Sequence, residues 1–296
     1  MIRVGENMKI DDVDFYLMDL KSRFDKIKPD TYYLSYSGGK DSHFLFWFIK
    51  EYLKRDDIKI VGINTLMEHH EILQRIRKNS DIVLYPEIKP FDLKEKYGSP
   101  CFSKVQDDII DRWQAGKRCP YLYARIDGKS LNGEKSQFGL SKKARKLLLE
   151  GKLHRISPKC CKYLKKDVAK KFQKESGLKP ILGVRSGESL QRRAVYTSCF
   201  KKDGRFTPIW DLSDDLLEKI YKKYNIEIPE VYNHVCRTGC MGCPYGSWKH
   251  DTEKELMLIS DGQFKFVTEY FKESYEVLGI DVEGIRKERQ SAKSAL

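Results

Sequence analysis

The stretch 31-TYYLSYSGGKDSHFLFWFIKEYL-53 combines three structural signals in a row. The β-branched and aromatic residues at 31–36 predict a buried strand, and the apolar run at 43–53 predicts a buried helix. A glycine pair followed by Lys, Asp and Ser stands between them. Amide N–H groups and the positive end of a helix dipole converge at such a turn, so the stretch predicts an anion site whose natural guest is phosphate.

The letters of 37-SGGKDS-42 exclude two common phosphate loops. A Walker A loop has a glycine separated by four residues from its Gly-Lys pair, and a Ser or Thr directly after the lysine. Here those positions are Leu34 and Asp41. The dinucleotide pattern G-x-G-x-x-G is also absent, because Gly38 and Gly39 are adjacent and no third glycine follows.

The loop 37-SGGKDS-42 resembles the pyrophosphate loop of the PP-loop ATP pyrophosphatase superfamily, which includes AMP-forming synthetases, tRNA sulfur-transfer enzymes and adenylyl-sulfate reductases. The resemblance implies an ATP site with Mg²⁺, in which Lys40 and Asp41 are catalytic. It assigns the nucleotide phosphates to Ser37, Gly38, Gly39, Lys40, Asp41 and Ser42. An ordinary glycine turn between strand and helix is the alternative.

Length and composition limit the class of protein. The chain of 296 residues can form one large domain, or one domain with an appendage. No apolar run reaches the length of a membrane span, and residues 1–14 lack the apolar core of a signal peptide. We therefore expect a cytoplasmic protein with no membrane partner, in which eight cysteines indicate metal ligation or redox chemistry rather than structural disulfides.

Four cysteines form two close pairs, in 159-KCCKYLKK-166 and 239-GCMGCPYG-246. A disulfide between neighbours is strained and structural zinc takes cysteines two to four residues apart, so four thiolates from two places favour an iron–sulfur cluster. The pattern resembles the one that ligates a 4Fe-4S cluster in adenylyl-sulfate reductases of the phosphoadenylyl-sulfate (PAPS) reductase family. The resemblance implies that the ligands are Cys160, Cys161, Cys240 and Cys243.

Two other metal hypotheses remain open. Cys236 extends the second pair to C-x-x-x-C-x-x-C, the spacing of radical S-adenosylmethionine enzymes. The late position of this motif and the unexplained Cys160-Cys161 pair count against that class. Zinc in the same four thiols is the second alternative. With a cluster in place, Cys236 is a spare thiol, either inert or a catalytic sulfur carrier.

Further segments extend the resemblance and add substrate contacts. It implies an adenosine pocket at Thr65, which ends the strand expected at 58–65, and a phosphate or sulfate contact at Lys104. The stretch 180-PILGVRSGESLQRRA-194 matches the family's substrate-binding turn at Arg185, Glu188 and Arg192. Independently, the planar guanidinium fork suits phosphate or sulfate, although a solvated, salt-bridged turn is the alternative. We expect solvent-facing or capping roles for His69 and His70, and burial for Cys101 and Cys119.

The fold class follows from alternating elements. Strands expected near 31–37, 58–65, 81–86 and 180–184 alternate with helices, which predicts an α/β fold with a mostly parallel sheet covered on both faces. The resemblance implies the Rossmann-like adenine nucleotide alpha-hydrolase fold. We expect a PP-loop domain with the iron–sulfur cysteines at residues 1–250 and a helical C-terminal appendage at 251–296.

Charge is concentrated in one segment. Residues 141–174 hold thirteen Lys or Arg against Glu150 and Asp167, a net charge of +11. Such a concentration indicates a polyanion, and we expect a nucleic-acid partner at this segment. Two helices with solvated lysine faces are the alternative.

A cysteine in the C-terminal tail distinguishes the thiol-dependent reductases from other members of the family. Thiol-dependent reductases attack the sulfur of adenylyl sulfate with a cysteine in a C-terminal tail, and this chain has no cysteine after Cys243. We therefore expect an enzyme that cleaves ATP to AMP and pyrophosphate and so activates a nucleic acid for sulfur transfer, as a sulfurtransferase does. We also expect it to hold the 4Fe-4S cluster. The alternatives are an adenylyl-sulfate or phosphoadenylyl-sulfate reductase, which binds adenylyl sulfate in place of ATP, and a non-catalytic iron–sulfur nucleic-acid-binding protein.

Overall fold

The computed structural model describes residues 11–188, 190–235, 239–247 and 251–294. The chain forms two compact units, each built from three separate segments. The first unit comprises Met1–Ile63, Ile72–Leu84 and Lys170–Pro229, and the second comprises Asn64–Glu71, Tyr85–Ala169 and Glu230–Leu296.

The first unit is built on a four-stranded parallel sheet in the order β3-β2-β1-β4. The strands are β1 (Tyr32–Tyr36), β2 (Lys59–Ile63), β3 (Ile82–Leu84) and β4 (Lys179–Ile181). In the register, Leu34 of β1 pairs with Ile60 of β2 on one side and with Ile181 of β4 on the other. All four predicted strands are confirmed, and so is the α/β class with a parallel sheet.

Burial on both faces explains the composition of the central strands. Tyr33, Leu34 and Tyr36 are almost completely buried although they alternate between the faces of β1, as expected for a parallel sheet with helices on both sides. The helix predicted after the glycine pair is also present. It consists of α2 (Lys40–Trp47) continued by a π-helical turn, Phe48–Tyr52.

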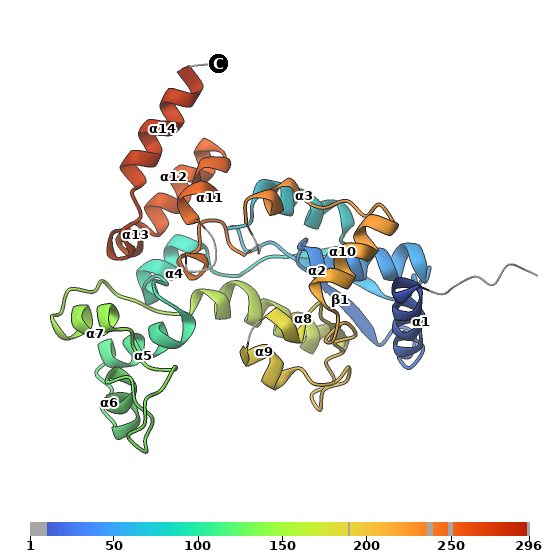
Figure 1. Cartoon of the computed structure of the whole chain (residues 1–296), viewed down its shortest axis with the longest axis horizontal. Coiled ribbons are helices and arrows are strands. Elements are labelled where there is room, and N and C mark those ends of the chain that lie inside the picture. The colour runs from blue at the N-terminus through green and yellow to red at the C-terminus, as the bar shows by residue number, and fades with distance from the viewer. Residues whose placement is uncertain (1–10, 189, 236–238, 248–250, 295–296) are drawn as a thin grey trace, which may run out of the picture. The chain divides into compact units, whose positions relative to one another are not determined.

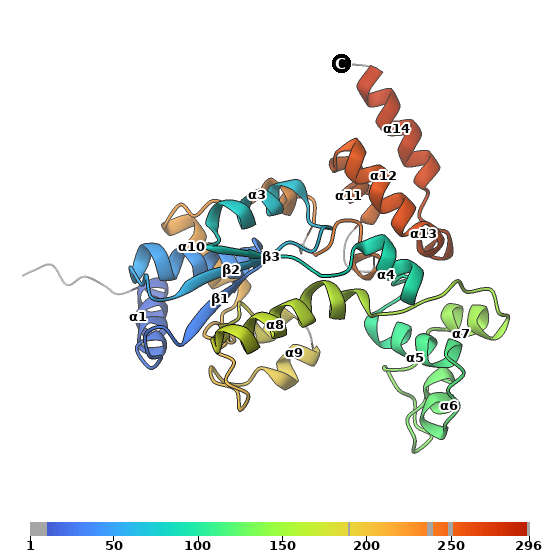
Figure 2. The same ribbon diagram turned by 180° about the vertical axis from the view of Figure 1, so that it is seen from behind.

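Helices cover the two faces of this sheet. Those that belong wholly or mainly to the first unit are α1 (Asp12–Phe24), α2, α3 (His70–Asn79), α8 (Asp167–Ser176), α9 (Leu190–Val195) and α10 (Asp214–Lys223). Figures 1 and 2 show α3 and α8 on opposite sides of the strands. This follows from the strand order, because right-handed connections that move in opposite directions across a sheet place their helices on opposite faces.

The second unit is helical in its described residues. Its α-helices are α4 (Pro90–Tyr97), α5 (Lys104–Gln114), α6 (Pro120–Ile126), α7 (Lys142–Leu149), α11 (Thr252–Leu258), α12 (Asp261–Tyr270), α13 (Lys272–Leu278) and α14 (Val282–Ser294). Shorter turns are the π-helical Lys162–Lys166 and the 3₁₀-helical Glu230–Asn233 and Pro244–Gly246. No helix of the described residues combines the length and apolarity needed to cross a bilayer.

Two hydrophobic cores organise the second unit. One joins Leu256, Val267 and Tyr275 of the C-terminal helices to Leu164 and Met241, and the half-buried Cys160 and Cys240 pack against it. The other lies among α5, α6 and α7. The residues expected as a C-terminal appendage are thus helical, and they share a core with the cysteine-bearing segments.

Candidate functional site

The glycine pair lies at the point where the order of strand addition to the sheet reverses. The chain steps from β1 to β2 and β3 on one side, and β4 then pairs with the other side of β1. The stretch after β1 and the stretch after β4 therefore flank the topological switch, where open α/β sheets bind ligands. Ser37 follows β1 directly, and Gly39 is the N-cap residue of α2.

Two glycines allow the backbone to approach closely at this turn. Gly38 has φ +72°, and a Cβ at this position would lie 3.0 Å from the Ile72 carbonyl oxygen. Gly183, in the stretch after β4, lies against the start of α2, because a Cβ there would be 2.9 Å from the Ser42 amide nitrogen. A side chain at Gly38 would push the loop away from α3, and a side chain at Gly183 would push the stretch after β4 away from the start of α2.

Hydroxyl groups fix the loop from inside. The Ser42 Oγ donates to the Gly39 carbonyl at 3.0 Å and accepts from the Ser37 amide at 3.2 Å. The Ser37 Oγ lies 3.0 Å from the Ser42 Oγ. Ser37 is exposed while Ser42 is buried, so Ser42 shapes the loop and Ser37 presents its side chain to solvent.

The structure brings Arg185 onto the predicted catalytic Asp41. Arg185 is 9% exposed, and its Nε donates to the Asp41 Oδ1 at 2.7 Å while its Nη1 lies 2.7 Å from Asp214. Burial alone would lower the pKa of Arg185, but the two carboxylates outweigh burial and raise it. Arg185 therefore holds the carboxylate of Asp41 in a fixed position at the start of α2.

Three further contacts around the loop were not predicted from the sequence. The Tyr221 hydroxyl of α10 donates to the Lys40 carbonyl at 2.7 Å. Beneath the loop, the Tyr36 hydroxyl lies 2.9 Å from the His43 Nδ1 and accepts from Asn79 at 3.0 Å. Burial lowers the pKa of His43 to about 3, so His43 is neutral around pH 7. The sequence did not predict these hydrogen bonds, because Tyr36 and His43 lie within apolar runs that indicate burial and not specific partners.

The remaining predicted residues of the arginine-rich turn lie on short helices. Glu188 ends the 3₁₀ turn Ser186–Glu188, and Arg192 lies half-buried on α9. The side chain of Glu188 lies outside the described part of the structure, so its substrate role stays a prediction.

The four predicted ligand cysteines surround a second site, a cavity of about 20 Å³ in the second unit. Its walls also include Met67, Pro100, Leu164, Lys165, Tyr270 and Phe271. The C-terminal helix α12 thus contributes directly to the enclosure of thiols from residues 160–161 and 240–243.

The thiols influence one another's acidity. The hydrogen bond between Cys160 and Cys161 raises the pKa of Cys160 and lowers that of Cys161. The cationic Lys104 and Lys165 lower the pKa of Cys161 further, against the opposing effect of burial. Burial raises the pKa of Cys240 to about 11 and also raises that of Cys243.

Lys165 supplies positive charge beside the cysteines. Burial would lower its pKa, but negative charge on Cys240, Glu68 and Cys161 raises it. Glu68 lies 3.6 Å from the Lys165 ammonium and accepts from the Thr65 hydroxyl at 2.7 Å. Thr65 and Lys104, both predicted as nucleotide contacts, thus lie in the second unit, near Cys240 and Cys161 respectively.

The four thiols are not arranged in advance for either a single metal ion or a cluster. A tetrahedral ion with metal–sulfur bonds of about 2.3 Å needs its sulfurs within about 4 Å of one another. Among the described residues, no three Cys, His, Asp or Glu side chains form a group that could hold a metal ion. An iron–sulfur cluster takes thiolates at separate irons, and the four cysteines line one cavity. The cavity now has the volume of about one water, so a cluster requires the thiols to spread.

A buried polar network holds the loop between Cys240 and Cys243. The Glu255 carboxylate accepts from the Gly242 amide at 2.9 Å and lies 2.7 Å from the His69 Nε2. The Tyr275 hydroxyl donates to the Gly242 carbonyl at 2.6 Å. The expectation of a solvent-facing side chain was wrong for His69, which is 5% exposed and lies directly before α3, and it was right for His70, the first residue of α3.

Two other cysteine predictions had different outcomes. Cys101 is completely buried, as expected, whereas Cys119 is exposed, because it is the N-cap residue of α6 and precedes Pro120. Cys236 lies outside the described residues, so its proposed role as a sulfur carrier stays a prediction.

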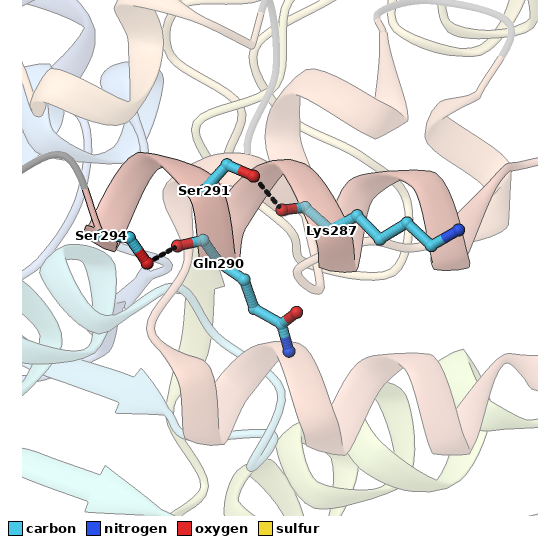
Figure 3. Close-up of a pocket in the computed structure, with 4 residues that line it drawn as sticks. All are labelled: Lys287, Gln290, Ser291 and Ser294. Carbon is cyan, nitrogen blue, oxygen red and sulfur yellow. Dashed lines mark hydrogen bonds between the residues drawn. The ribbon is translucent and has the colours of Figure 1, made fainter.

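A wide hollow of about 580 Å³ runs along α14 but offers little chemistry (Figure 3). The hydroxyls of Ser291 and Ser294 donate to the carbonyls of Lys287 and Gln290 in the preceding turn. This hollow is an open strip of helix surface.

No family model and no curated protein matches the chain.

Proposed function

We propose that the protein is an AMP-forming PP-loop enzyme that cleaves ATP to activate a nucleic-acid substrate for sulfur transfer. One observation carries the proposal. The turn at Gly38 and Gly39 lies at the topological switch of a parallel sheet, opens α2 and has Asp41 held by the buried Arg185. This arrangement supports phosphate binding beside a fixed carboxylate.

In the proposed reaction, a substrate oxygen attacks the α-phosphorus of ATP. An O–P bond forms, the bond to the β-phosphate oxygen breaks, and pyrophosphate leaves with the electron pair. The amides of Gly38 and Gly39 and the ammonium of Lys40 stabilise the charge that develops on pyrophosphate, whereas the Ser37 amide is engaged within the loop by the Ser42 hydroxyl. Asp41 would hold Mg²⁺, and Arg185 acts as a positioning residue for that carboxylate.

The adenylated carbon is then open to a sulfide-level sulfur donor. A C–S bond forms, the C–O bond breaks, and AMP leaves with the bonding pair, so the exchange needs no net oxidation or reduction. Cys160, Cys161, Cys240 and Cys243 would hold the 4Fe-4S cluster, with Lys165 offsetting part of the thiolate charge. When bound, the cluster supplies electron transfer or iron that can ligate sulfur.

The charge distribution supports a nucleic-acid substrate. The net charge of +11 on residues 141–174 exceeds what one nucleotide needs. The π-helical turn Lys162–Lys166 begins directly after Cys161, so this basic segment carries half of the cysteine set.

An anaerobic product assay tests the ATP reaction. ATP, adenylyl sulfate and phosphoadenylyl sulfate are offered separately, with and without bulk tRNA or DNA. We expect AMP and pyrophosphate from ATP, stimulated by one nucleic acid, and loss of both products in Lys40→Ala. Lys54→Ala, an exposed lysine beyond α2, is the matched control. Sulfite release with ATP untouched would instead establish a reductase.

Metal content tests the cysteine assignment separately. Anaerobically purified protein should be brown and hold about four irons, as a cubane cluster does. Cys160→Ser should bleach it, while Cys119→Ser, at an exposed thiol outside the cavity, should leave the colour unchanged. A colourless protein with one zinc would contradict the cluster.

A further inference from the structure

Helices α5, α6 and α7 form a small module, residues 104–149, within the second unit. Figures 1 and 2 show the three helices side by side. Their shared core includes Ile110, Leu122, Ile126, Ala144 and Leu148. The module has buried apolar residues of its own, so its exposed aromatic residues are surplus to that core.

One group of exposed aromatic residues surrounds an arginine on α6. Tyr121 and Arg125 are one helical turn apart, and the Arg125 guanidinium lies 5.0 Å from the Tyr121 ring centre and 5.9 Å from that of Phe138. Tyr121 is 42% exposed and Phe138 is 39% exposed. Arg125 also donates to the Ser136 hydroxyl. Two flat rings are therefore held beside a fixed planar cation.

A second group lies where α5 meets α6. The guanidinium of Arg118 stacks 3.6 Å from the Trp113 ring centre, and Trp113 meets the Tyr123 ring edge-on at 5.6 Å. Half of Tyr123 is exposed. The Arg118 Nη1 donates to the Trp113 and Lys117 carbonyls, which fixes its plane. The module thus presents rings and guanidinium planes at two places.

The module also carries cations without acidic partners. The module holds eleven Lys or Arg against five Asp or Glu. Asp107 is buried, while Asp108, Asp111 and Asp127 form ion pairs with Arg112, Lys159 and Arg145. In the described structure no ion pair joins an acidic side chain to any of six exposed cations, Lys117, Arg118, Lys129, Lys135, Lys142 and Lys143.

We propose that the two exposed aromatic and basic groups of the α5–α7 module bind single-stranded nucleic acid. Unpaired bases expose their faces, so they can stack on Tyr121, Phe138 and Tyr123, whereas the bases of a duplex are already stacked on each other. The surplus cations attract the phosphates without reading sequence. The inference deepens the proposed function, on which it rests for the biological role, by specifying an unpaired region of the substrate.

Fluorescence anisotropy tests the inference with full-length protein and no nucleotide. The probe is a short mixed-sequence oligonucleotide, single-stranded or annealed to its complement, in DNA and RNA versions. We expect the single strand to bind more tightly. Tyr121→Ala with Phe138→Ala should weaken that affinity by about 5- to 150-fold, the range expected when base stacking is removed, and leave duplex affinity and the salt dependence unchanged.

Matched variants separate stacking from charge and from misfolding. Tyr121→Phe should retain affinity, whereas Tyr121→Leu, which keeps apolar area without a ring, should lose it. Tyr85→Ala, an exposed tyrosine outside the module, should have no effect. Lys142→Ala with Lys143→Ala should lower the salt slope for the single strand by about 0.7 for each phosphate that the lysines no longer neutralise.

The outcomes separate this inference from the proposed function. Tighter duplex binding, or unchanged single-strand affinity in the Tyr121 and Phe138 variants, would overturn the inference of base stacking even if ATP cleavage occurs. Tight single-strand binding that depends on the rings would support base stacking even if no AMP is formed, and in that case the enzymatic proposal alone would fail.

Discussion

Gly38 and Gly177 have the same backbone φ angle, +72°, and differ in their surroundings. A Cβ at Gly177 would meet no atom within 4 Å, whereas a Cβ at Gly38 would meet the Ile72 carbonyl at 3.0 Å. The pair therefore separates the cost of a left-handed residue from the cost of a close approach.

We expect Gly177→Ala to lower the free energy of unfolding by about 1–2 kcal/mol, the cost of a left-handed non-glycine residue. Gly38→Ala should cost at least about 1 kcal/mol more, because the added methyl must displace the Ile72 backbone. It should also weaken ATP binding. Urea denaturation and nucleotide titration of both variants check this, and equal costs would contradict the tight packing of the loop.

His43 makes the stability of the first unit depend on pH. The pKa of His43 is about 3 in the folded chain, lowered by burial from an ordinary value of 6.5. Between these values the unfolded chain binds a proton that the folded chain does not. The contribution of His43 is therefore fully present above pH 6.5 and is lost as pH falls toward 3, by up to about 5 kcal/mol.

Denaturation at several pH values, compared between wild type and His43→Gln, should show this loss as a steeper acid slope in wild type. His234→Gln, at an exposed histidine, should keep the wild-type slope. Parallel slopes in wild type and His43→Gln would mean that His43 does not remain neutral on folding.

At the scale of elements, the sequence predicted the first unit better than the second. The four strands and the glycine turn were predictable because each depends on neighbours in sequence, such as the apolar run at 31–36. The cysteine set was predictable only through its resemblance to a known ligand pattern. Its surroundings, including Glu255 beside His69 and Tyr275 on Gly242, join residues more than thirty positions apart, and sequence spacing gives no signal for them.

Arg289 of α14 forms hydrogen bonds to the end of α11, a contact that the sequence did not predict. Its side chain is 9% exposed and donates to the carbonyls of Leu256, Met257 and Ile259, which end α11, as well as to Asp261. The last carbonyls of a helix have no partners within it. Arg289 therefore caps α11 and fastens it to α14.

We expect Arg289→Lys to lower the free energy of unfolding of the second unit by about 1–3 kcal/mol, because an ammonium cannot reach all four acceptors and leaves buried carbonyls unpaired. Arg286→Lys is the matched control, since Arg286 is exposed and pairs only with Glu283 in the described structure. Thermal unfolding followed by circular dichroism distinguishes them, and equal midpoints would rule out the capping role.

At the scale of the whole molecule, two compact units predict two unfolding events. Calorimetry should resolve two transitions. A non-hydrolysable ATP analogue with Mg²⁺, at a hundred times its Kd, should raise the free energy of unfolding of the first unit by about 2.7 kcal/mol and so raise the midpoint of one transition. Cys160→Ser should change the midpoint of the other transition, that of the second unit. A single transition with equal calorimetric and van't Hoff enthalpies would show instead that the units unfold together.

The division of each unit among three chain segments has a consequence for synthesis on the ribosome. Cys160 and Cys161 emerge long before α12 and α14, whose residues complete the core around them. At roughly 5–20 residues per second, translation from Cys161 to the end of α14 takes roughly 7–27 seconds. During this time the paired thiols lack their enclosure and are open to oxidation. The enclosure that the proposed cluster would need is therefore complete only after the chain is finished, and a reducing environment would protect the thiols of the nascent protein until then.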